Sequence, residues 1–199
     1  MPRHYVPTET RRRQVAEAAL KTIAEDGVAS FTTRAVAARV GISDGTLFRH
    51  FGSKEEVVLE AMGILEAELV ESLVDTGDAR ADLEAFFRHR AAFVGAQSSV
   101  GRLIFSDELV HLAGEEGKGR VEQWRRQSVG YLLERLGALR MRGALRDAPD
   151  VPAMSMLLQG ALLTFAMQAS LGRAGSAEDL EARIQHAWNA LTVVLFPTR

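Results

Sequence analysis

The stretch that decides how the chain is organised is residues 31–54, which read FTTRAVAARVGISDGTLFRHFGSK. Apolar residues recur at three- and four-residue spacing on both sides of Gly41, which predicts two short helices joined by a tight turn. Thr33 is placed to cap the first of these helices and Ser43 the second. Two short helices joined in this way are the layout of a helix-turn-helix.

One face of this helix pair is predicted to pack on a preceding helix, expected over residues 9–26 and closed by Gly27. The predicted buried set is Ala35, Val36, Val40, Ile42, Leu47 and Phe51. The other face carries Gly45, Phe48 and Arg49, an unusual set for a plain solvent-facing surface. A helix of about seven residues is roughly 10 Å long, which fits a DNA major groove about 12 Å wide.

The rest of the chain is also expected to be helical, so the predicted fold class is all-α. Runs that alternate between apolar and polar residues, as strands do, are missing from the sequence. We expect an N-terminal helix-turn-helix domain over residues 1–54 and a helical bundle over residues 55–199. The further helices are expected near residues 54–74, 78–96, 100–113, 116–142, 151–171 and 177–196.

The composition of the 199 residues excludes several classes of chemistry. The chain has no cysteine, which excludes disulfides, thiolate metal sites and cysteine nucleophiles.

Residues 151–172 carry no charge and are long enough to cross a bilayer, but Gln159 and Gln168 within them are costly in hydrocarbon. We therefore expect a helix buried on all sides, no membrane partner and a cytoplasmic protein.

The helix-turn-helix segment resembles the DNA-binding domain of the TetR family of transcriptional regulators. The likeness covers about a quarter of the chain and lies in several residues at fixed offsets. These are Thr33, then Val40-Gly41-Ile42-Ser43, Gly45-Thr46-Leu47-Phe48 and His50-Phe51-Gly52-Ser53-Lys54.

The resemblance implies that Thr33 and Lys54 hold phosphates at helix N-termini, where N–H groups and the helix dipole favour anions. It implies that Asp44, Thr46 and Arg49 face base edges, since Arg suits guanine and Asp accepts a hydrogen bond from cytosine. Phe48, where the family often has Tyr, offers no hydroxyl to a phosphate. The full set expected to contact DNA is Thr32, Thr33, Arg34, Ser43, Asp44, Gly45, Thr46, Phe48, Arg49, His50 and Lys54.

The last two expected helices are implied by the resemblance to form a four-helix interface in a homodimer. A two-fold dimer would read two half-sites about one helical turn apart on a palindromic operator. The residues expected at this interface are Gly160, Ala161, Thr164, Ile184, Trp188, Leu191 and Leu195. The alternative is that both helices complete the core of a monomer.

A largely apolar pocket for a small-molecule effector is the second site expected in residues 55–199. Its expected lining is Phe86, Phe93, Phe105, Trp124, Met154, Gln159, Phe165 and Gln168. Aromatic and Met residues at helical spacing are also typical of plain core, and that alternative stays open. Asp107, Glu108 and His111, with His89 nearby, have the side chains that could bind a metal. A lone His beside acids is more often polar surface or a pocket edge, so we expect no metal and no cofactor.

The sequence therefore predicts a ligand-responsive repressor that binds a double-stranded DNA operator as a dimer and is released by a small apolar effector. An all-helical enzyme is the competing class, but nucleophile-elbow, phosphate-loop and His-Glu-x-x-His motifs are missing from the sequence. A helical interaction protein whose N-terminal domain does not bind DNA is the third. The net charge of −2 divides into +4 over residues 1–54 and −6 over the remainder, which would steer the N-terminal domain toward phosphates.

Overall fold

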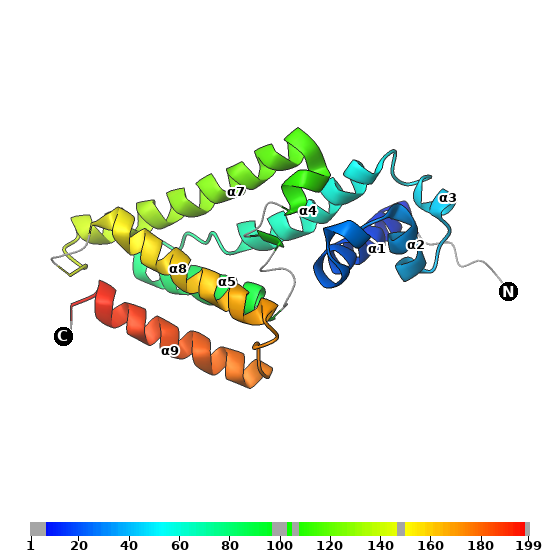
Figure 1. The fold of residues 1–199 in the computed structure, drawn as a ribbon. Helices are drawn as coiled ribbons and strands as arrows, with labels where there is room; N and C mark the ends of the chain where they lie inside the picture. Colours follow the sequence, from blue (N-terminus) through cyan, green and yellow to red (C-terminus); the bar gives the residue numbers. More distant parts are fainter. Residues whose placement is uncertain (1–6, 97–102, 105–107, 147–149, 198–199) are drawn as a thin grey trace. The chain divides into compact units, whose positions relative to one another are not determined.

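The computed structural model describes residues 7–96, 103–104, 108–146 and 150–197, and every regular element among them is helical (Figure 1). This confirms the all-α class. The α-helices with described bounds are α1 (Thr8–Lys21), α2 (Thr33–Val40), α3 (Asp44–Leu47), α4 (Lys54–Glu71), α5 (Ala79–Ala96), α7 (Glu108–Met141), α8 (Val151–Ser170) and α9 (Ala177–Leu195).

Helix α7 contains the break that the sequence predicts at Gly114, whose backbone is non-helical at φ 63° and ψ −154°. A side chain is disfavoured at such a φ, so glycine suits the position. Of the helix expected over residues 100–113, residues 103–104 and 108–113 are described and are helical, and the other six lie outside the described residues.

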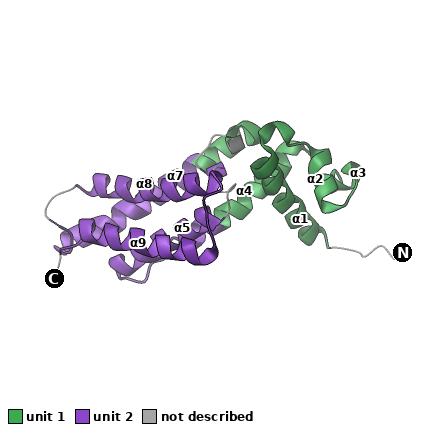
Figure 2. Ribbon diagram, turned by 60° about the horizontal axis from the view of Figure 1, so that its bottom comes forward, with its two compact units in different colours: residues 1–67, 106–121 green, residues 68–105, 122–199 purple. Residues whose placement is uncertain are grey.

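The chain forms two compact units (Figure 2). Unit 1 comprises residues 1–67 and 106–121, and unit 2 comprises residues 68–105 and 122–199. The first compact unit thus continues past residue 54 and includes a later segment of the chain. The functional boundary expected after residue 54 stays a prediction.

Unit 1 is built around α1, which packs on α2. After Lys21 the chain makes one π-helical turn, Thr22–Asp26, and Gly27 ends it at φ 82°. Val15, Ala19 and Ile23 on this helical segment are completely buried. The helix therefore presents one continuous apolar face to the helix-turn-helix.

The predicted buried set of the helix-turn-helix divides into two classes. Val36, Leu47 and Phe51 are buried, whereas the other three members, Ala35, Val40 and Ile42, are half-buried. Helices this short place few residues fully inside, so the ends of each apolar face stay at the edge of the core.

Arg12 connects α1 to the end of the helix-turn-helix and to α4. Its Nη1 donates to the backbone carbonyl of His50 at 2.5 Å and to Glu56 Oε1 at 2.9 Å. Its Nη2 donates to Glu60 Oε2 at 2.6 Å, and the guanidinium lies 4.3 Å from the centroid of the Phe51 ring. A planar cation with several donors can make all these contacts at once, which a lysine cannot.

Unit 2 is a helical bundle in which α5 packs against both α8 and α9. The Phe87 ring lies 6.2 Å from the Phe165 ring of α8 and 5.7 Å from the Trp188 ring of α9, measured between centroids. Phe86 stacks on Tyr131 of α7 at 5.2 Å. These aromatic contacts join α5, α7, α8 and α9 into one core.

Helix α8 is long and apolar enough to cross a membrane, judged by length and composition alone. Its inner face lies in the unit 2 core through Met154, Leu158 and Phe165. Its outer face is exposed in the single chain, with Met156 at 72% and Met167 at 56% exposure. The expectation of burial on all sides is therefore wrong for one chain, because none of the helices described in the structure covers this outer face.

Replacing Arg12 with Met should lower the free energy of unfolding of unit 1 by about 1–2 kcal/mol, because Glu56, Glu60 and the His50 carbonyl lose their donor. Urea denaturation followed by circular dichroism measures it. Arg13→Met is the matched control: Arg13 is 76% exposed and pairs only with Glu17 among the described residues, so its loss should cost under about 0.5 kcal/mol. An equal loss of unfolding free energy in the two variants would contradict the stabilising role assigned to Arg12.

Candidate nucleic-acid interface

The turn between α2 and α3 is fixed by local hydrogen bonds. The N-cap of α2 is Thr32, whose hydroxyl accepts from the N–H of Ala35 at 3.1 Å, and not Thr33 as predicted. Thr33 is instead the first helical residue, because Thr32 has the extended backbone that a cap requires. Gly41 ends α2 at φ 73°, and the next N–H, of Ile42, returns to the carbonyl of Ala37. This is a Schellman-type ending.

Three polar side chains form a connected chain along α3. The Ser43 hydroxyl caps the helix by accepting from the N–H of Thr46 at 3.1 Å, as predicted. The two hydroxyls of Ser43 and Thr46 lie 2.9 Å apart, and Arg49 Nη2 donates to Thr46 Oγ1 at 2.9 Å. Arg49 is exposed, and among the described residues only one of its five N–H donors is used, so its guanidinium is held in place with donors available to a base.

The outer surface of α3 is open. Phe48 is 46% exposed, and Gly45 is exposed with no atom within 4 Å of the position that a Cβ would occupy. The fold of the single chain therefore does not require glycine at this position. A partner whose backbone or groove approaches α3 closely would require it.

Asp44 and His50 are half-buried. Asp44 Oδ1 is buried and has no hydrogen-bond partner among the described residues. The backbone of His50 is held by Arg12. Asp44 is the first residue of α3, and His50 lies three residues after its last residue, Leu47.

The N-terminus of α4 is capped by Ser53, whose hydroxyl accepts from the N–H of Glu56 at 3.1 Å. The Glu56 carboxylate reaches back to the N–H of Gly52 at 2.6 Å, one residue before the position that a standard capping box uses. The Gly52 hydrogen bond, and after it the Arg12 guanidinium, lowers the pKa of Glu56. Glu56 thus stays charged at neutral pH, and its pairing with Arg12 is lost only as the pH falls through this lowered pKa.

Three other predicted DNA contacts lie at helix N-termini. Lys54 is the first residue of α4, and its ammonium is 4.9 Å from the centroid of the Phe31 ring. Thr33 and Arg34 open α2, and Arg34 is exposed. The structure therefore brings the predicted residues together in unit 1, on α2, α3 and the start of α4.

Sequence reasoning missed two arginines that hold this region. Arg12 connects the helices, and Arg39 of α2 donates to Glu25 and Asp26 at 2.7 Å each. Arg12 lies in a run of three arginines, and only the helix phase that puts it beside the buried Val15 and Ala16 distinguishes it from Arg11 and Arg13.

The predicted effector-binding residues fall into different surroundings in unit 2. Phe86, Met154 and Phe165 are members of its core, and Phe93 is half-buried against that core. Phe105 lies outside the described residues. Burial does not distinguish core from ligand contact for these residues, so that prediction stays open.

The polar side chains among the predicted effector-binding residues differ in whether they already make a hydrogen bond within the chain. Gln159 donates to the hydroxyl of Ser155 at 3.0 Å, and Gln168 accepts from Arg183 at 2.8 Å. Trp124 is 4% exposed, and its Nε1–H has no hydrogen-bond partner among the described residues. Buried donors are rarely left unpaired in proteins, so Trp124 is the member that most needs an acceptor.

The residues predicted at the dimer interface differ in how exposed they are within the single chain. Ile184, Trp188 and Leu195 of α9 are at most 3% exposed within their own chain, so their side chains offer no surface to a partner. Gly160 and Thr164 of α8 are exposed. The remaining two, Ala161 and Leu191, are half-buried. The three buried residues face inward because α9 uses that face to cover α5.

The geometry of α2 and α3 is that of helix-turn-helix proteins, and comparison with known proteins agrees. The family model of bacterial regulatory proteins, tetR family, matches residues 15–61. The HTH-type transcriptional repressor KstR2 of Mycobacterium tuberculosis is 31% identical over 154 residues, which cover 71% of this chain and 72% of the repressor. The chain belongs to the TetR family.

KstR2 of Rhodococcus jostii is 34% identical over 110 residues, and the match spans about half of each chain, 53%. Among solved structures, M. tuberculosis KstR2 superposes with a TM-score of 0.77 at 22% identity, covering 94% of this chain and 96% of that one. The structure of AibR in complex with isovaleryl coenzyme A and operator DNA superposes with a TM-score of 0.71 at 19% identity, and the match covers 94% of this chain and 100% of AibR. The structure of FadR of Bacillus subtilis in complex with stearoyl-CoA superposes with a TM-score of 0.66 at 17% identity, and the match covers 90% of this chain and 96% of FadR. These structures share the fold.

Two substitutions should separate base contacts from phosphate contacts. Arg49→Ala should cost about 1–3 kcal/mol of binding free energy at one base pair of the operator, because Arg49 presents free guanidinium donors beside Thr46. Lys54→Ala should weaken binding to all sequences alike and reduce the slope of log affinity against log salt by about 1.

Fluorescence anisotropy on single-base operator variants at several salt concentrations measures both effects. Lys21→Ala, which removes an exposed charge at the end of α1, is the control and should change neither specificity nor the salt slope by a comparable amount. The contact assignment fails if both Arg49→Ala and Lys54→Ala bind like the unmodified protein.

Proposed function

We propose that the chain is a dimeric, ligand-responsive transcriptional repressor that works in the cytoplasm and is not an enzyme. The observation that supports this most is the Ser43–Thr46–Arg49 chain on the open face of α3, which holds a guanidinium ready for a base edge. Hydrogen bonds that already exist in the free protein reduce the entropy lost when DNA binds. The relatives named above are transcriptional repressors, which favours the same role here.

The experiment that tests this function is a gel-shift assay on the DNA upstream of the protein's own coding sequence at fixed salt. We expect a shifted band that excess unrelated DNA does not remove, because specific sites bind about 10³–10⁷ times more tightly than non-specific DNA. Removal of the band by equal amounts of unrelated DNA would refute the proposal, in favour of an interaction protein.

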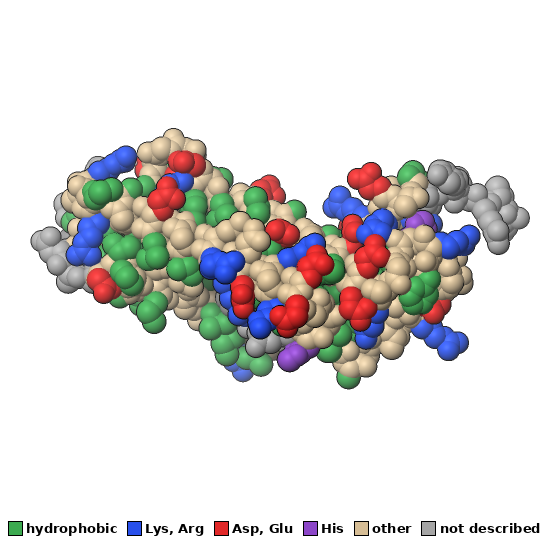
Figure 3. All heavy atoms as spheres, turned by 90° about the horizontal axis from the view of Figure 1, so that it is seen from above, with side chains coloured by type: hydrophobic (Ala, Val, Ile, Leu, Met, Phe, Trp, Pro, Cys, Tyr) green, Lys and Arg blue, Asp and Glu red, His purple; other side chains and the backbone are tan. Residues whose placement is uncertain are grey.

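The outer face of α8 supports the dimer. Exposed residues recur along one side of the helix, and several of them are large and apolar or small (Met156, Gly160, Leu163, Thr164, Met167 and Leu171). Val193 of α9 is 58% exposed as well. Figure 3 shows hydrophobic side chains at several places on one face of unit 2. An apolar face of this extent is typical of an interface, and Gly160 would allow the partner helix to approach closely.

Met167→Glu should convert the dimer to a monomer at micromolar concentration, because it places a charge in the apolar interface while leaving the chain's own core intact. Sedimentation velocity measures the change, and circular dichroism checks that the variant is folded. Met141→Glu is the matched control, since Met141 is 86% exposed and is the last residue of α7, outside α8. Dimerisation of Met167→Glu with unchanged affinity would exclude this face.

For the effector we propose an acyl thioester of coenzyme A, whose carbonyl oxygen accepts the free Nε1–H of Trp124. Two structures of the same fold contain isovaleryl coenzyme A and stearoyl-CoA. An acyl chain suits a unit whose core includes Phe, Leu and Met side chains, and the Trp124 N–H would orient the thioester at its polar end.

Trp124→Phe should weaken acyl-CoA binding by about two- to tenfold, the value of one buried hydrogen bond, and leave DNA affinity unchanged. Calorimetric titration with isovaleryl-CoA and stearoyl-CoA measures it. Phe93→Leu, at a half-buried position without a polar atom, shows what lost aromatic packing alone does. If the unmodified protein binds neither thioester, the effector assignment fails and the DNA-binding role is unaffected.

A further inference from the structure

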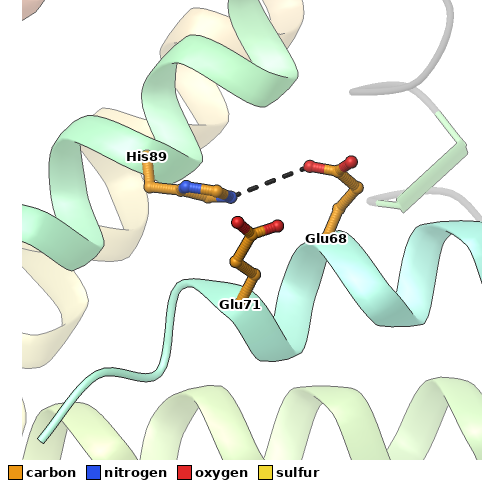
Figure 4. Close-up of side chains that lie close together, drawn as sticks. All are labelled: Glu68, Glu71 and His89. Atoms are coloured by element: carbon orange, nitrogen blue, oxygen red, sulfur yellow. Dashed lines mark ion pairs between the residues drawn. The ribbon is translucent and has the colours of Figure 1, made fainter.

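Three side chains with metal-ligating atoms converge between the last turn of α4 and α5, both of which belong to unit 2. Glu68 and Glu71 lie one turn apart at the end of α4, and His89 lies on α5 (Figure 4). One ligand atom from each residue lies within 4.8 Å of the other two. Both carboxylates point toward the imidazole in Figure 4. Of the residues that the sequence grouped with His89, Asp107 lies outside the described residues.

The His89 ring nitrogen that faces the carboxylates has no hydrogen bond. Nε2 has no accessible surface and no hydrogen-bond partner among the described residues, although other atoms of the side chain are partly exposed. The nearest carboxylate oxygen, Glu68 Oε2, is 3.8 Å away, which is too far for a hydrogen bond. A buried imidazole nitrogen is therefore aimed at two carboxylates without binding either.

The charge of the two carboxylates is also unbalanced. Within the described part of the chain, no Lys or Arg forms an ion pair with Glu68 or Glu71. The neighbouring Arg88 and Arg90 are used elsewhere: Arg88 binds Glu84 and Gln185, and Arg90 binds Ser72. Two carboxylates this close repel each other, and a divalent cation between them would remove that repulsion.

We propose that Glu68, Glu71 and His89 form a binding site for a divalent transition-metal ion of the zinc class. Imidazole nitrogen combined with carboxylate oxygen suits Zn²⁺ and its neighbours, whereas Mg²⁺ and Ca²⁺ take oxygen ligands. Bonds to Zn²⁺ of about 2.0–2.2 Å require the two Glu side chains to turn inward by rotation. Glu71 is exposed and Glu68 is 42% exposed, so both have room to do so.

Such an ion would join the last turn of α4 to α5. Three protein ligands leave at least one coordination position for water or for an oxygen of another molecule, which is the arrangement of open metal sites. The proposal does not depend on DNA binding or on the acyl-CoA assignment, because it rests on these three side chains alone.

Isothermal titration with Zn²⁺ tests the site, using full-length protein that carries no histidine tag and has been stripped with a chelator. We expect one ion per chain in the unmodified protein. His89→Gln and Glu71→Gln should each weaken binding by at least about tenfold, as loss of a metal ligand does. Glu71 is exposed, so we expect the Glu71→Gln chain to stay folded, which circular dichroism checks. With Co²⁺ in place of Zn²⁺, the unmodified protein should show visible absorption bands that His89→Gln removes.

His186→Gln is the matched control, because His186 is exposed on α9 of the same unit, and it should bind Zn²⁺ like the unmodified protein. Binding that survives His89→Gln, binding that Mg²⁺ displaces at equal concentration, or no binding to the unmodified protein would each overturn the proposal. Since neither DNA nor effector enters the measurement, each of these results would leave the regulator assignment untouched.

Discussion

The Arg12 guanidinium makes the contact on which the rest of unit 1 depends. Where α3 ends, the chain has to turn into α4, and Arg12 holds the His50 carbonyl, two α4 carboxylates and the Phe51 ring from its place on α1. A short α3 has little stability of its own, since helices of this length are unstable in isolation. Its position therefore depends on the helices before and after it, and Arg12 bonds to both sides of that junction.

Once α3 is held in position, local hydrogen bonds are enough to orient the side chains on its outer face. Ser43 caps the helix and contacts Thr46, and Thr46 orients Arg49. A regulator built in this way can respond to a ligand if ligand and DNA favour different conformations of the same chain. Coupling of about 1–3 kcal/mol between the two sites would change DNA affinity roughly 5- to 150-fold, and it would act equally in both directions.

Local signals in the sequence predicted the helix-turn-helix well. Gly41 and Ser43 act within a few residues of themselves, so their roles could be read from spacing, and the exposure of Phe48 followed from the same pattern. The N-cap was predicted one residue late because two threonines are adjacent and only backbone geometry decides between them. Contacts between distant residues could not be predicted: Arg12 meets Glu60 across 48 residues, and periodicity says nothing about such pairs.

Residues 55–199 were harder to predict for a related reason. An apolar residue on α8 or α9 can face its own core or a partner chain, and the sequence pattern is the same in both cases; Trp188 proved to be core and Met167 exposed. The His89 cluster likewise joins two helices whose alignment the sequence does not specify.

Selection of binding sites from a random double-stranded DNA library tests the central claim most directly. The account predicts that the unmodified protein enriches one inverted repeat with half-sites about one helical turn apart, and that a Thr46→Ala, Arg49→Ala double substitution abolishes the enrichment. Absence of an enriched motif with the folded, unmodified protein, or the same motif with the double variant, would contradict it.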